Sequence, residues 1–162
     1  MGAAMPGMKQ EVRNRILLRI DGLKLMLPQG DICAVESVSD MNLQEPPPYA
    51  AGRILYLGQS WPVISMNAEF QALDFVPAGR RACVMLATGA GFLGLLCDDV
   101  RVLNQLDLED FALPMAMRAH NTPIHALMHF EAGLACLSDA GRLLKFGVFA
   151  AVLHAQTTSR ES

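Results

Sequence analysis

The chain has 162 residues, of which 52% are apolar and 18% charged, and its formal net charge is −3. This length predicts one domain, or two small units that share a core. The abundance of aliphatic residues excludes an intrinsically disordered chain. Nucleic acid is not an expected partner, because phosphates demand clustered Lys and Arg side chains. The aliphatic content also favours surfaces that bind other proteins.

The sequence predicts a cytoplasmic protein without direct membrane insertion. No apolar run approaches the roughly 20 residues that cross a bilayer, and the N-terminus lacks the apolar core of a signal peptide. The four cysteines lie far apart among apolar neighbours, which favours buried free thiols over disulfides. They are Cys33, Cys83, Cys97 and Cys136.

The first half of the chain predicts short strands separated by turns. Residues 1–13 predict a flexible leader. Asp21-Gly22 is a hairpin signal, and the prolines at 46–48 place 39–51 in a loop, because proline cannot enter a central strand. Asn67 predicts the cap of a short helix at 68–73. The predicted strands are 16–20, 23–27, 32–38, 52–57 and 61–66.

The second half repeats this order. Turns at 89–91 and 131–133 separate the predicted strands, and the longest strand is expected to bend near Asp98-Asp99. Asp139 predicts the cap of a C-terminal helix at about 139–154, followed by a flexible tail at 155–162. The predicted strands are 82–88, 92–106, 124–130 and 134–137.

The repeated order of hairpin, proline loop, hairpin and capped helix predicts two similar units stacked on each other. Short strands with regular turn signals favour barrels over an open parallel sheet. We therefore expect an all-β fold of two small antiparallel β-barrels, at about 14–76 and 80–140, with short helices that include the C-terminal one.

A glycine pattern offers a different interpretation. Residues 89–94 match the dinucleotide fingerprint G-x-G-x-x-G, and Glu109 or Asp110 follows at the spacing of a ribose ligand. This alternative is a small dinucleotide-dependent enzyme, and it requires a helix to begin at the glycines. Residues 92–103 show no helical stripe, so a glycine hairpin is the favoured explanation.

Other candidate chemistry lacks the required spacing. His120, His125 and His129 are close in sequence, but on a strand the Cα atoms of the last two would lie ~13 Å apart, too far to share one metal ion easily. Asp98 and Asp99 would point to opposite faces of a strand and not form an acid–base pair. No serine occupies a G-x-S-x-G motif. We expect no catalytic residue, metal or cofactor.

Three stretches of the sequence carry a resemblance to a known family. The first runs from Pro47 and Gly52 through Leu57-Gly58 to the motif at 62–66, Pro-Val-Ile-Ser-Met. The second is Gly-Leu-Leu-Cys-Asp-Asp-Val at 94–100, followed by a linking loop at 106–115. The third, at 124–144, has a closing hairpin and a Leu-Leu pair. In order and spacing they resemble the CheW-like coupling domains of bacterial chemotaxis over residues 14–146.

The resemblance implies two five-stranded SH3-like β-barrels and a non-catalytic scaffold. Such a protein joins the cytoplasmic tips of chemoreceptors to the regulatory domain of a CheA-type histidine kinase. A degenerate copy of the fold that serves as a regulatory or dimerisation module is a further alternative.

Two residues depart from the family pattern. Leu57 stands where the family has an arginine, and Ser65 stands where it has an aspartate. Because an ion pair of that arginine would be lost, we expect a divergent coupling protein of the kind that governs type IV pili and twitching motility. We expect a docking surface on the 52–66 strand pair and a groove towards 100–102. The expected protein-binding residues are Gly52, Ile54, Leu57, Gly58, Pro62, Val63, Val100 and Val102.

Overall fold

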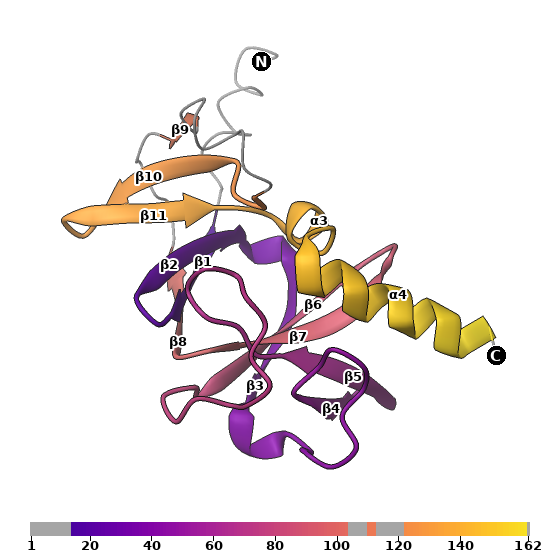
Figure 1. The fold of residues 1–162 in the computed structure, drawn as a ribbon. Helices are drawn as coiled ribbons and strands as arrows, with labels where there is room; N and C mark the ends of the chain where they lie inside the picture. Colours follow the sequence, from indigo (N-terminus) through magenta and orange to yellow (C-terminus); the bar gives the residue numbers. More distant parts are fainter. Residues whose placement is uncertain (1–13, 104–109, 113–121, 162) are drawn as a thin grey trace, which may run out of the picture.

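The computed structural model describes residues 14–103, 110–112 and 122–161, in which eleven strands form two curled sheets (Figure 1). Sheet A has the order β8-β1-β2-β11-β10-β9, and sheet B has the order β3-β6-β7-β5-β4. The prediction of an all-β fold built as two small SH3-like barrels is confirmed, with six strands in sheet A where five were expected. The strands are β1 (Arg15–Ile20), β2 (Leu23–Pro28), β3 (Ile32–Ser37), β4 (Gly52–Tyr56), β5 (Gln59–Ile64), β6 (Ala82–Thr88), β7 (Gly91–Cys97), β8 (Asp99–Leu103), β9 (Asp110–Ala112), β10 (Ala126–Phe130) and β11 (Gly133–Leu137).

The two sheets do not divide the chain at the predicted boundary between 76 and 80. β1 and β2 belong to sheet A, where β1 pairs with β8 and β2 pairs in parallel with β11. Sheet B contains the chain between them, from β3 to β7. Turn signals predict which neighbouring strands form a hairpin, but not which distant strand completes a sheet. The single long strand expected at 92–106 is likewise two strands, because the chain passes from sheet B to sheet A at Asp98.

The core lies inside each curled sheet and also between the sheets. In β1, Leu17 is buried inside sheet A, whereas Ile16 and Leu18 face a core shared by both sheets. In β6, Met85 is buried inside sheet B and Val84 faces the shared core. Alternating side chains thus explain why these strands are apolar on both faces.

Two helices follow the last strand. Asp139 accepts a hydrogen bond from the backbone N–H of Arg142 at 2.7 Å, so the predicted cap is confirmed, but it begins only the short α3 (Ala140–Leu143). α4 (Gly147–Glu161) then runs alongside β7 (Figure 1). The helix therefore continues to Glu161, past its expected end at about 154. None of the described helices is long and apolar enough to cross a membrane.

The helix predicted at 68–73 is also wrong. The side-chain oxygen of Asn67 accepts from the backbone N–H groups of Glu69 and Gln71 at 2.9 and 3.0 Å, but it closes a turn. Phe70 has a φ of 63°, and this left-handed conformation does not continue a helix.

A buried arginine joins the two sheets. The guanidinium of Arg80 donates two hydrogen bonds to Asp21, at 2.8 and 3.0 Å, one to Asp98 at 2.7 Å, and one to the carbonyl of Met66 at 2.7 Å. Asp21 lies in the β1–β2 turn of sheet A, and Met66 follows β5 of sheet B. Hydrogen bonding to Arg80 holds the pKa of Asp21 below its ordinary value. Since all three partners come from different segments, this cluster fixes how the sheets meet.

All four cysteines are free, as expected, but their environments differ. Cys83 and Cys97 are buried, and burial raises the pKa of the Cys83 thiol to about 12. Cys33, on β3, is exposed, which contradicts the expectation of a buried thiol.

Candidate protein-docking surface

The glycine pattern at 89–94 forms a hairpin. Gly89 and Ala90 connect β6 to β7, which pair in antiparallel fashion from Ala82–Cys97 to Thr88–Gly91. Strand residues therefore occupy the positions where the cofactor interpretation requires a helix. A Cβ atom at Gly94 would lie 2.5 Å from the Cys83 sulfur, so this glycine serves the packing of sheet B.

The other chemical candidates are also dispersed. In the described residues, no three His, Cys, Asp or Glu side chains gather where they could hold a metal ion. His120, Glu109 and the linking loop at 106–115 lie wholly or partly outside the described residues. Asp98 accepts hydrogen bonds from Arg80 and from the backbone N–H of Asp21, so it has a structural role.

The β4–β5 pair and its turn form the feature that we call the docking hairpin. Leu57 and Gly58 make a two-residue turn with φ values of 51° and 76°. A turn with two positive φ angles matches the twist of a hairpin and is normally made by Asn-Gly or Asp-Gly. Leu57 is 81% exposed, and Leu55, on the outer strand β4, is 74% exposed. The hairpin thus presents leucines where folding alone would favour polar residues.

Four of the predicted binding residues lie in the interior. Ile54 and Val63 are buried inside sheet B, and Pro62 is buried beside them on β5. Gly52 is buried where a Cβ atom would approach the Met41 side chain to 2.6 Å. Because these four residues are buried, they support the hairpin and present little surface of their own.

The predicted groove towards 100–102 lies on a different sheet. β8 is the outer strand of sheet A, and the docking hairpin is at the outer edge of sheet B. Val102 is 51% exposed, whereas Val100 is partly buried against the shared core. The structure therefore offers two separate edges where the sequence suggested one continuous surface.

Sequence reasoning missed several exposed apolar residues in the segment of the chain that contains the hairpin. The described chain has eight large apolar side chains that are exposed, and five of them fall between residues 43 and 75. We call these five the apolar set. They are Leu43, Tyr49, Leu55, Leu57 and Phe75. Those in loops had no periodic signal that could have predicted their direction.

Two loops present the aromatic members of the apolar set. Tyr49, with a φ of 68°, lies against 72–74 of the second loop, and these residues line a hollow of about 530 Å³. The buried hydroxyl of Ser65 donates to the carbonyl of Phe75 at 2.8 Å and so fixes this loop. A carboxylate at 65, as in the family pattern, could only accept hydrogen bonds and would face that carbonyl.

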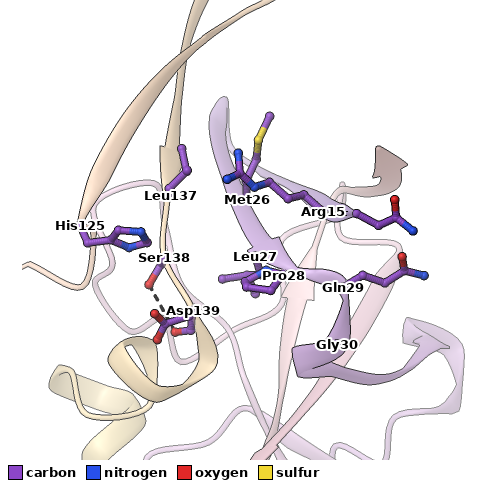
Figure 2. Close-up of a pocket in the computed structure, with 11 residues that line it drawn as sticks. Arg15, Met26, Leu27, Pro28, Gln29, Gly30, His125, Leu137, Ser138 and Asp139 are labelled. Carbon is purple, nitrogen blue, oxygen red and sulfur yellow. Dashed lines mark hydrogen bonds between the residues drawn. The ribbon is translucent and has the colours of Figure 1, made fainter. Parts of the chain in front are cut away.

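A second hollow, of about 660 Å³, opens where β2 and β11 diverge (Figure 2). Figure 2 shows His125, Ser138 and Asp139 on one side and Arg15 with Gln29 on the other. Ser138 donates to the carbonyl of Pro123, and Asp139 caps α3. These two polar groups serve the local fold, and the docking hairpin belongs to the other sheet.

Comparisons with known proteins agree with this architecture. The family model described as CheW-like domain matches residues 15–146. None of the curated proteins compared matches the chain significantly. Among solved structures, the chain is similar to the scaffolding protein TtCheW from Thermoanaerobacter tengcongensis, with 14% identity and a TM-score of 0.60, covering 78% of this chain and 83% of that one. The structural likeness supports the fold, and the family model covers most of the sequence. The chain belongs to the CheW-like family.

Proposed function

We propose that this protein is a non-catalytic adaptor of a bacterial chemosensory system, which couples chemoreceptor tips to the regulatory domain of a CheA-type histidine kinase in the cytoplasm. Membership of the CheW-like family supports a scaffold role in chemotaxis. The observation that carries the assignment of the kinase-binding surface is Leu57, exposed at the tip of the docking hairpin.

Leu57 is unfavourable for folding in two ways. A left-handed conformation costs a residue with a Cβ atom roughly 1–2 kcal/mol. Its side chain is 81% exposed and so gains little from burial. A strained, exposed apolar residue at the tip of an edge hairpin is typical of a site kept for binding.

The chemistry of Leu57 favours a dry contact with the kinase. An arginine at this position would offer a charged fork to a carboxylate, whereas leucine fits an apolar socket. This difference supports a divergent pathway, of the type that controls pili and twitching motility. The receptor tip, as an amphipathic helix, is assigned to the separate β8 edge at Val100 and Val102.

Titration of the kinase regulatory domain into the full chain tests the assignment. Leu57→Asp places a charge in the socket and should weaken binding by at least about tenfold, while the unfolding midpoint does not fall. Leu134→Asp is the matched control, because Leu134 is 50% exposed but lies on sheet A, and it should bind as the wild type does.

Three results would contradict the proposal. The wild type would fail to bind the domain, Leu57→Asp would bind with unchanged affinity, or Leu57→Asp would lose folding and binding together. Self-association of the wild type without kinase binding would favour a regulatory or dimerisation module. Leu57→Arg tests the divergent pathway, because it restores the residue of the family pattern and should weaken binding to the cognate kinase. If this variant binds the kinase and assembles with receptors and kinase as the wild type does, the basis for a divergent pathway is removed.

A further inference from the structure

Helix α4 is hydrogen-bonded to β7, the strand next to the docking hairpin. The side-chain amide of Gln156 donates to the carbonyl of Phe92 at 2.6 Å and accepts from its N–H at 3.5 Å. The parallel ladder between β5 and β7 pairs Val63 with Gly94 and Ile64 with Leu95. Gln156 therefore binds β7 two residues before this ladder, in the manner of an added strand residue.

The helix approaches the first residue of β7, Gly91, too closely for a side chain there. A Cβ atom at Gly91 would lie 2.8 Å from both the Gln156 oxygen and a Leu153 methyl group. Phe149 and Val152, on the same side of α4, are buried in the shared core. The contact is thus a fitted one, with apolar packing along the helix and the amide at its far end.

An aromatic row connects this contact to the hairpin tip. The ring of Phe92 lies 4.7 Å from that of Trp61, and the ring of Trp61 meets that of Tyr56 edge-on at 5.3 Å. Tyr56 is the last residue of β4 and directly precedes Leu57. Gln156 holds the backbone of the first ring, and Leu57 follows the last.

We infer that α4 sets the conformation of the docking hairpin, with Gln156 as a positioning residue for partner binding. The inference rests on the proposed function for the identity of the partner. α4 lies beyond residues 15–146, which match the family model. The aromatic row transmits the influence of α4, because a shift of Phe92 leaves a gap that Trp61 and Tyr56 can only fill by moving.

The test uses Gln156→Leu and Gln156→Glu in the full chain. Leucine removes both hydrogen bonds, and glutamate keeps the volume but replaces the N–H donor with a carboxylate. Both should weaken binding of the kinase regulatory domain by about fivefold. They should also shift the emission of Trp61, the single tryptophan, and speed hydrogen exchange at Tyr56 and Gln59, which close the hairpin.

Controls separate positioning from general damage. Gln29→Leu makes the same change at an exposed residue near the other hollow and should leave binding and emission unchanged. In a Leu57→Ala background, Gln156→Leu should cost much less affinity than it does alone, because both act through one contact. Equal costs in the two backgrounds would overturn the inference.

The outcomes distinguish the two proposals. If the wild type binds and both Gln156 variants bind equally well, the positioning role is wrong and the proposed function stands. If the wild type does not bind the kinase domain, both are wrong. A changed Trp61 emission with unchanged affinity would show that α4 contacts the row without controlling docking, and would overturn the inference.

Discussion

Replacing Leu57 by asparagine should make the protein more stable and a poorer binder. Leu57 has a φ of 51° and precedes Gly58, so Leu57→Asn creates the Asn-Gly pair that this turn type prefers. The left-handed conformation costs leucine roughly 1–2 kcal/mol, and it costs asparagine less. Its side chain is 81% exposed, so little packing is lost. We therefore expect the free energy of unfolding to rise by about 1 kcal/mol.

Calorimetry and titration together measure this exchange. For a chain of this size, about 1 kcal/mol raises the unfolding midpoint by roughly 2–4 °C. In the same preparation, affinity for the kinase regulatory domain should fall about tenfold, because a buried leucine contact is lost. A lower midpoint would show that Leu57 packs in the fold, and an unchanged affinity would show that the hairpin tip does not dock. Either result would refute the reasoning.

Three further predictions concern the structure that carries the hairpin. Arg80→Met should lower the free energy of unfolding by about 2–4 kcal/mol, because the carboxylates that bind this arginine lose their buried cationic partner. Arg142→Met breaks an exposed ion pair and should cost less than about 1 kcal/mol. Equal losses of stability for the two variants in chemical denaturation would refute this prediction. The pKa of Asp21 lies below its ordinary value, so the stabilising effect of its carboxylate is present above pH 3.8 and is lost as the pH falls through the lowered pKa. Asp21→Asn should therefore reduce the loss of unfolding free energy at acid pH. An unchanged pH dependence of stability would contradict this role of Asp21. Gly94→Ala should destabilise the protein by about 1–3 kcal/mol, since the new Cβ atom would lie 2.5 Å from a cysteine sulfur. Gly89→Ala, with open space around it, should melt like the wild type. The reverse order of stability would argue against the β6–β7 hairpin.

Local patterns predicted much of the fold because they act between neighbouring residues. Asp21-Gly22 does form the expected turn, and Asp139 caps a helix. The turn expected at 58–60, between the predicted strands 52–57 and 61–66, is instead formed by Leu57-Gly58. The pairing of β2 with β11 and of β1 with β8 depends on contacts between distant residues, and no turn signal encodes them. The prediction of a helix after Asn67 was wrong for a related reason, because the left-handed conformation of Phe70 belongs to the loop and has no local signal in the sequence.

The candidate site was predictable at its centre and not at its margins. Leu57 drew attention as a departure from the family pattern, and the turn places it in solvent. Ile54 and Val63 lie nearby in sequence but face inward, because a strand alternates its side chains. Tyr49 and Phe75 lie in loops, where no period predicts the direction of a side chain.

Hydrogen exchange of the full chain, with and without the kinase regulatory domain, tests the docking surface most directly. The account predicts that binding protects the amides of the docking hairpin around Leu57 and of the loops that carry Tyr49 and Phe75. Protection confined to the β10–β11 turn of sheet A, with the hairpin exchanging as in the free protein, would contradict it.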